Sequence, residues 1–112
     1  MRYTKFGNTG LIVSRLAFGA MTFGKGEFMG FKYTVDQNEA NRMVKHAIDA
    51  GINFFDTADM YAQGLSEEML GKALKGRRDD VVITTKVGSR SGPAIVNAGL
   101  SYKHVIAAAE SS

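Results

Sequence analysis

Short apolar segments alternate with helical segments along this chain, and that alternation constrains its fold more than any other feature. Between residues 36 and 50, apolar side chains recur at the i, i+3, i+4, i+7 and i+8 spacing of one helical face, and Gly51 follows as a stop. Residues 52–55 and 81–87 are apolar and suit buried strands. Because strands that alternate with helices usually pair in parallel, the chain is predicted to be α/β with a parallel sheet.

The other segments extend this pattern at both ends. Residues 2–6 and 11–13 flank a turn-forming group and predict an N-terminal hairpin. Residues 15–19 predict a short strand, and the stretch 21–32 predicts a long loop with several glycines. A second loop, rich in glycine and serine, is predicted at 88–99. The predicted order is hairpin, strand, helix, strand, helix, strand, helix.

Hydroxyl and carboxylate side chains mark the predicted helix starts. Thr34 with Gln37, or Asp36 with Glu39, forms a capping-box pattern before the first helix. Ser66 is predicted to cap the second helix, which ends at Gly76. Ser101 is predicted to cap the third, which carries three apolar residues on one side: Val105, Ile106 and Ala109.

Composition narrows the function classes. The 112 residues are 45% hydrophobic and 22% charged, as expected for one small globular domain. The 14 basic residues are mostly scattered among 11 acidic ones, so no dense basic stripe predicts nucleic-acid binding. With no cysteine and two separated histidines, we expect neither a disulfide framework nor a metal site. No signal peptide and no apolar run of about 18 residues is present, so we expect a cytoplasmic protein without a membrane segment.

Polar residues stand at the ends of the predicted strands. In parallel α/β folds, functional groups collect at the carboxyl ends of strands, and Gly19, Asp56 and Lys86 all fall there. Tyr61 follows Asp56 in a polar segment. A nearby ammonium stabilises a phenolate, so Lys86, held by Asp56, would make Tyr61 a general acid toward a carbonyl oxygen. Taken alone, these residues also suit plain roles as a turn residue, a loop aromatic and a solvated strand end.

Long stretches around these positions resemble the aldo-keto reductases. This family folds as a (β/α)8 TIM barrel and transfers hydride from NADPH to aldehydes and ketones. The resemblance implies an N-terminal β-hairpin plus the first three β/α units of a truncated barrel. Residues 1–112 would be a single partial domain, with 1–14 as a hairpin capping the barrel bottom. The matching stretches are 7–16, 18–24, 51–61, 66–74, 84–86 and 99–101.

The resemblance also implies roles for individual residues. Tyr61 would be the proton donor, Lys86 the partner that favours its phenolate, and Asp56 the partner of Lys86. Asp56 would also neighbour the nicotinamide ribose of NADPH. The first strand end, Gly19 with Ala20 and Met21, would lie against the nicotinamide half of the cofactor. A small carbonyl compound would be the substrate.

One part of the family's site has no counterpart here. The family places a catalytic histidine after the fourth strand, and the chain stops in a helix that has no glycine, proline or basic stop signal. His46 and His104 fall on predicted helices and cannot replace that histidine. We therefore expect the 112-residue chain itself to be inactive, although the resemblance implies that its parent barrel would reduce carbonyls.

Two other functions remain open at this stage. A non-catalytic module that resembles the channel-associated β subunits of the same fold would also carry the three polar residues. An inert truncated remnant, with an unpaired strand edge, is the other possibility.

Overall fold

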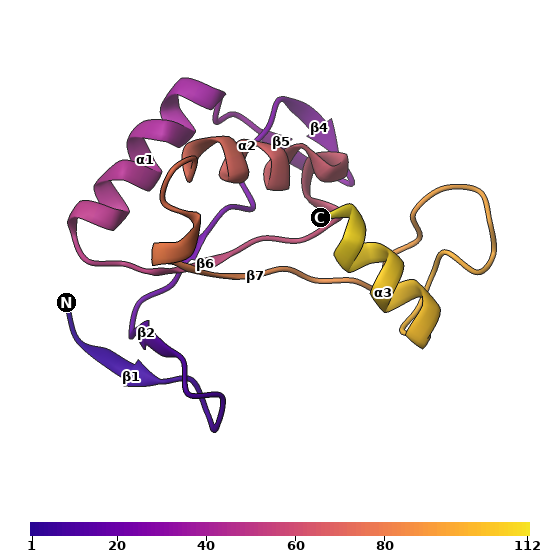
Figure 1. The fold of residues 1–112 in the computed structure, drawn as a ribbon. Helices are drawn as coiled ribbons and strands as arrows, with labels where there is room; N and C mark the ends of the chain where they lie inside the picture. The colour runs from indigo at the N-terminus through magenta and orange to yellow at the C-terminus, as the bar shows by residue number, and fades with distance from the viewer.

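A computed structural model describes residues 1–112 and shows a three-stranded parallel sheet with two helices packed on one face (Figure 1). The strand order is β3-β6-β7, so the three strands lie in the sheet in the same order as in the sequence. The predicted α/β class with a parallel sheet is therefore confirmed. Its elements are β3 (Phe18–Gly19), β6 (Phe54–Asp56) and β7 (Val82–Thr84), with α1 (Gln37–Asp49) and α2 (Leu65–Ala73) above them.

The register of the sheet brings the strand ends into one row. Gly19 pairs with Asp56, and Asp56 pairs with Thr84 on its other side. Phe55, one residue earlier, points to the opposite face and is fully buried. The sheet thus has a face that packs under the helices and a face that carries polar groups at its carboxyl end.

The core lies between the sheet and the two helices. Phe55 contacts Phe18 with ring centroids 5.6 Å apart, and Phe18 in turn lies 5.8 Å from Phe23. The predicted stripe of α1 supplies buried residues from above. Ten buried apolar residues form this cluster: Ala20, Phe23, Ala40, Val44, Ala47, Phe55, Met69, Leu70, Leu74 and Val81.

Helix α1 begins and ends where its sequence signals predict. The Asp36 carboxylate accepts a 2.9 Å hydrogen bond from the Glu39 amide, so Asp36 rather than Thr34 is the cap. At the other end Gly51, with φ of 87°, donates to the Ile48 carbonyl, and the next amide reaches back to residue 47. This pair of bonds is a Schellman motif, which favours glycine at its left-handed position.

The predicted role of Ser66 as the cap of the second helix is wrong. Helix α2 begins at Leu65 after Gly64, and Ser66 lies inside its first turn, fully buried. Its hydroxyl points into the protein, toward Ala20 and Thr57, rather than back to the helix amides. Ser66 therefore bonds to residues that are distant in the sequence instead of capping its own helix.

The predicted loop at 21–32 contains a β-hairpin that the sequence patterns missed. Strands β4 (Gly26–Phe28) and β5 (Phe31–Tyr33) pair antiparallel across a two-residue turn, with φ of 52° at Met29 and 79° at Gly30. Two-residue hairpin turns of this kind usually carry Asn-Gly or Asp-Gly. Because methionine occupies the first turn position here, the sequence lacks the usual signal for such a turn.

Several contacts join the N-terminal hairpin to the start of β6, including a hydrogen bond from the Tyr3 hydroxyl to the Gly51 carbonyl at 2.8 Å. Strands β1 (Tyr3–Lys5) and β2 (Ile12–Ser14) pair antiparallel, as predicted. The Asn53 side chain accepts from the Ser14 amide at 2.7 Å and donates to the Ile12 carbonyl at 3.0 Å. Phe6 stacks edge-on against Phe54 at 5.4 Å. The hairpin therefore lies at the amino end of the sheet, opposite the row of polar strand ends (Figure 1).

The third helix, α3 (Tyr102–Ser111), stands apart from the other two (Figure 1). Ser101 caps it as predicted, accepting from the His104 amide at 3.2 Å. Its apolar side remains open, since Val105 and Ile106 are 37% and 43% exposed, while His104 is only 4% exposed. Two short 3-10 turns, η1 (Tyr61–Gly64) and η2 (Arg78–Asp80), complete the chain. None of the helices is long and apolar enough to cross a membrane.

Candidate active site

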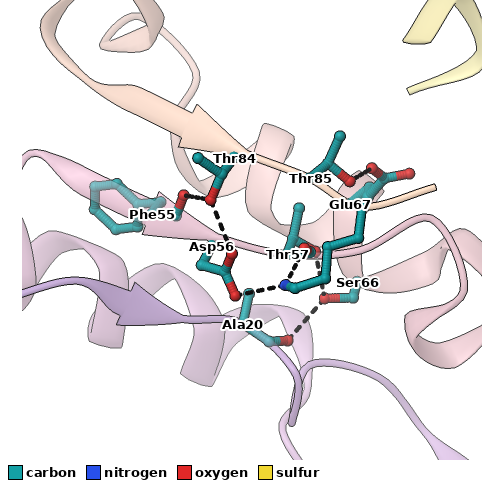
Figure 2. A network of polar contacts seen from close by, with 9 residues as sticks. Ala20, Phe55, Asp56, Thr57, Ser66, Glu67, Thr84 and Thr85 are labelled. Atoms are coloured by element: carbon teal, nitrogen blue, oxygen red, sulfur yellow. Dashed lines mark hydrogen bonds and ion pairs between the residues drawn. The ribbon is translucent and has the colours of Figure 1, made fainter. Parts of the chain in front are cut away.

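Lys86 and Asp56 form an ion pair at the carboxyl end of the sheet. The Lys86 ammonium lies 2.6 Å from Asp56 Oδ2 and also donates to the Thr57 carbonyl at 2.8 Å. The other Asp56 oxygen accepts from the Thr84 hydroxyl at 2.8 Å (Figure 2). Both oxygens of the carboxylate are thus engaged, and the carboxylate holds a lysine from the adjacent strand segment in one place.

The ion pair shifts both of its members toward their charged forms. Partial burial on its own would raise the pKa of Asp56, but hydrogen bonds from Lys86 and Thr84 outweigh it and lower that pKa below 3.8. Burial would likewise lower the pKa of Lys86, but the bond to Asp56 outweighs it and raises that pKa above 10.5. Because the Lys86 and Asp56 side chains are 50% and 38% exposed, solvent screens much of this attraction.

Tyr61 lies beside the same ammonium. The Lys86 Nζ atom is 5.2 Å from the centroid of the Tyr61 ring, within the range of a cation–π contact. The structure therefore brings together the three residues that the sequence singled out, with Lys86 between the carboxylate and the phenol ring.

The turn that carries Tyr61 is held in a strained conformation. Ala62 and Gln63 follow it with φ of 48° and 58°, in the left-handed region that residues other than glycine rarely occupy. Gly24 packs tightly against this turn, since a Cβ atom on Gly24 would lie 2.7 Å from the Ala62 Cβ. Strain of this kind gathers where a fold fixes a functional group in place.

A buried hydroxyl pair links α2 to the end of β3 and was not predicted. Ser66 donates to the Ala20 carbonyl at 2.7 Å and lies 3.2 Å from the Thr57 hydroxyl (Figure 2). Nearby, Thr85 donates to the Glu67 carboxylate at 2.5 Å. The two partners in each of these hydrogen bonds come from different segments of the chain, so no local sequence pattern predicts them. Together they fix the strand ends that flank the ion pair.

The three residues of the first strand end, which were predicted together with Asp56 to face a cofactor, lie in different environments. Gly19 is exposed, and no atom lies within 4 Å of where its Cβ would be, so the sheet is open above it. Met21 is 42% exposed at the same end. Ala20 is fully buried, and its amide bonds to the Asp56 carbonyl at 2.8 Å. Gly19 and Met21 thus leave the sheet open at the end where Asp56 lies.

A parallel sheet with an acid, a lysine and a tyrosine at its carboxyl end has known relatives. A family model described as the aldo/keto reductase family matches residues 15–112. The chain belongs to the aldo/keto reductase family. The predicted hairpin is present as β1 and β2, and the first three β/α units of such a barrel are confirmed.

Individual aldo/keto reductase relatives match most or all of the chain. A protein of Arabidopsis thaliana, named as a probable voltage-gated potassium channel subunit beta, is 40% identical over 100% of this chain and 33% of its own length. Versiconal hemiacetal acetate reductase of Aspergillus parasiticus is 34% identical over 100% of this chain and 38% of its own length. A solved aldo-keto reductase from Bacillus halodurans, in its holo form, is 42% identical with a TM-score of 0.69, over 82% of this chain and 28% of that one. The chain spans about a third of the length of the curated relatives it matches.

The two histidines of this aldo/keto reductase chain take no part in the hydrogen bonds around Asp56. His46 is exposed in the last turn of α1, and His104 is buried in the first turn of α3. Within residues 1–112, the candidate site thus brings together the acid, the lysine and the tyrosine.

Proposed function

We propose that this chain provides the proton-donating half of a carbonyl reductase site that uses NADPH. Tyr61 is the general acid, Lys86 favours its phenolate, and Asp56 holds Lys86. The observation that carries this proposal is the place of the Lys86 ammonium, 2.6 Å from the Asp56 carboxylate and 5.2 Å from the Tyr61 ring centroid. An ammonium in that position favours the negative charge that the phenol acquires when it gives up its proton.

The chemistry follows from these positions. NADPH, when bound, supplies a hydride to the carbonyl carbon. The Tyr61 hydroxyl donates its proton to the carbonyl oxygen, which leaves an alcohol and a phenolate beside Lys86. The charge on Asp56 keeps Lys86 protonated during this step, so the ammonium stabilises the phenolate without losing its own proton.

The cofactor part of the proposal rests on the open strand ends. Gly19 and Met21 border free space beside Asp56, and we assign the nicotinamide half of NADPH to this space. Ala20 positions the neighbouring backbone, since both its amide and its carbonyl bond within the protein. The hairpin of residues 1–14 would close the opposite end of a complete barrel, as its bonds to Asn53 suggest.

The 112-residue chain itself is expected to turn over little substrate. It spans about a third of the length of its curated relatives, and (β/α)8 barrels usually need about 250 residues. In an assay of NADPH oxidation with an aromatic aldehyde, the pure chain should show no rate above background. A measurable rate would overturn this part of the proposal.

A chimera tests the catalytic roles directly. Residues 1–112 would replace the matching segment of the Bacillus halodurans aldo-keto reductase, which is 42% identical over 82% of this chain. The chimera should reduce aldehydes, and Tyr61→Phe should lower kcat by about 10²–10⁴-fold, because the substitution removes only the proton donor. Tyr102→Phe, on the exposed face of α3, is the matched control and should leave kcat unchanged. Equal rates for both variants would refute the assignment of Tyr61.

A second candidate function is a non-catalytic module of the same fold. It is favoured by the 40% identity to the plant protein named as a channel subunit. The two functions differ in what Tyr61 does, because a module that only binds a partner does not need a proton donor. If Tyr61→Phe in a full-length protein leaves every measured function intact, the module is the better description.

A further inference from the structure

Thr84, the last residue of β7, lies directly beside Asp56 in the sheet. The parallel register of β6 and β7 pairs the two residues, and their side chains meet on the same face. The backbone of Thr84 is fixed on this side, because its carbonyl accepts a hydrogen bond from the Thr57 amide at 2.9 Å. The Thr84 side chain is half-buried and so partly shielded from solvent. The hydroxyl of Thr84 therefore starts from a rigid element of the fold.

The Thr84 hydroxyl has a single proton and two acceptors within reach (Figure 2). Asp56 Oδ1 lies at 2.8 Å, whereas the Phe55 carbonyl oxygen lies at 3.4 Å. A hydrogen bond to a carboxylate is both shorter and stronger than one between neutral groups. The proton is therefore donated to Asp56. Because threonine is branched at Cβ, its χ1 torsion is stiff, and the donor stays aimed at the carboxylate.

Asp56 has no other rigid support for its carboxylate. Apart from Thr84, the one side chain that donates to it is Lys86. The terminal torsion of an aspartate has a broad energy minimum, and a lysine has a flexible four-carbon stem. The Lys86 side chain is also 50% exposed, so water competes for its ammonium. Two soft side chains that held only each other would not keep one position, and the Thr84 hydroxyl supplies the missing constraint.

The place of the Lys86 ammonium depends on this constraint. Its two acceptors are the Thr57 carbonyl, which belongs to the backbone, and Asp56 Oδ2. The backbone carbonyl alone would let the ammonium swing around a single bond, whereas two acceptors fix it. In the fixed position the ammonium lies 5.2 Å from the centroid of the Tyr61 ring. A carboxylate turned away from Lys86 would release the ammonium from the ring.

We propose that Thr84 is a positioning residue of the proton-donating site, because its hydroxyl orients the Asp56 carboxylate. Asp56 in turn keeps the Lys86 ammonium beside the Tyr61 ring. Thr84 forms no hydrogen bond with Lys86 or Tyr61, so it acts through Asp56. The catalytic consequence rests on the proposed reductase function, whereas the position of the ammonium can be measured without turnover.

The first test is the nuclear Overhauser effect between the Lys86 Hε protons and the Tyr61 ring protons, measured at neutral pH in the 112-residue protein. The wild-type protein should show it. Thr84→Val keeps the branched shape and removes the hydroxyl, so the effect should weaken severalfold, while the core contact between the Phe18 and Phe55 rings stays unchanged. Thr84→Ser restores the hydroxyl and should restore the effect.

The matched control is Thr85→Val, because the neighbouring Thr85 hydroxyl donates to Glu67 and not to Asp56. This variant should leave the effect unchanged. No effect in the wild-type protein, an unchanged effect in Thr84→Val, equal weakening by Thr85→Val or no recovery in Thr84→Ser would each overturn the proposal.

A second measurement on the wild-type protein decides the matter if Thr84→Val does not fold. During an acid titration, the Thr84 side-chain resonances should shift with the same midpoint as the Asp56 carboxyl carbon, because one hydrogen bond joins the two groups. Different midpoints would mean that the hydroxyl does not follow the carboxylate, and the proposal would fail.

The catalytic consequence is measured in the chimera with the Bacillus halodurans reductase. Thr84→Val should lower kcat about tenfold or more with little change in KM, because it displaces the ammonium and leaves the proton donor and the substrate contacts in place. Thr84→Ser should recover most of the rate. A higher KM at unchanged kcat would assign Thr84 to substrate binding and overturn the proposal. An unmutated chimera that is inactive would count against the proposed reductase function, and the contact between Lys86 and Tyr61 would still decide the role of Thr84.

Discussion

The substitution Ser66→Ala tests whether the buried hydroxyl between α2 and β3 stabilises the fold. Ser66 is fully buried, donates to the Ala20 carbonyl at 2.7 Å and lies 3.2 Å from the Thr57 hydroxyl. The Ala20 carbonyl keeps one bond after the change, because the Phe23 amide also donates to it at 3.0 Å. Only the Ser66 bonds are lost, at a cost of about 1–3 kcal/mol.

Part of that cost is offset within the helix. Alanine is a better helix former than serine by about 0.5 kcal/mol, so the net loss of stability should be about 0.5–2.5 kcal/mol. With a urea m-value of about 2 kcal/mol per M, the unfolding midpoint should fall by about 0.3–1.3 M. Urea unfolding followed by far-UV circular dichroism measures this shift.

The control is Ser91→Ala, which removes a hydroxyl from an exposed loop position and should leave the midpoint unchanged. Thr57→Val closes a double-mutant cycle with Ser66→Ala, and the two losses should be less than additive because they share one contact. If Ser66→Ala unfolds at the wild-type midpoint or above it, the hydroxyl pair does not stabilise the link between α2 and β3, and the reasoning fails.

Three further predictions concern the ion pair, the tyrosine turn and the hairpin. Because folding lowers the pKa of Asp56, the ion pair stabilises the protein above pH 3.8, and this stabilisation is lost as the pH falls below that value. Because folding raises the pKa of Lys86, the stabilisation is also lost as the pH rises above 10.5. Lys86→Met should therefore flatten both limbs of a stability-versus-pH curve, and unchanged limbs would contradict the ion pair. Gly24→Ala should lower the thermal unfolding midpoint by several degrees, because the new Cβ would lie 2.7 Å from the Ala62 Cβ and the backbone φ is 141°. The control Gly71→Ala, in α2, has free space for a Cβ and should not lower the midpoint. Equal midpoints for both variants would mean that the turn adapts to the added methyl group. Asn53→Ala removes both side-chain bonds to β2, so amide exchange in residues 3–14 should accelerate before that of α1, and uniform exchange would rule out Asn53 as the anchor.

Local sequence signals predicted the helix ends and the candidate site residues, whereas the role of Ser66 and the turn at Met29 depend on tertiary contacts. Gly51 and Ser101 act through bonds to residues within a few positions, so their roles were readable from the sequence. Ser66 has a capping residue's identity but bonds to Ala20, 46 residues away, and no local pattern records such a partner. The Met29 turn was missed because methionine in a left-handed conformation is uncommon, and pairing of the flanking strands holds it there.

Two of the three catalytic candidates could be paired from sequence order alone. Parallel strands align their carboxyl ends, so Asp56 and Lys86 on successive strand segments had to lie near each other. The Thr84 contribution was not anticipated, although the β6–β7 register places it directly beside Asp56. The position of Tyr61 depends on the left-handed turn that follows it, and the sequence of that turn does not reveal its conformation.

The tight contact between Gly24 and Ala62 has a consequence for how this segment can vary. Both positions are limited by the same gap, so a larger residue at one is tolerated only if the other becomes smaller. Among functional sequences from a randomised library, the two positions should therefore covary, because Ala62→Gly removes the 2.7 Å contact that Gly24→Ala creates, although the φ of 141° at position 24 still disfavours alanine. Position 63 should vary independently of these two positions and should favour glycine or asparagine, the residues that best adopt its left-handed conformation. In such a library, the geometry of the tyrosine turn would be visible as covariation between two residues that are distant in the sequence.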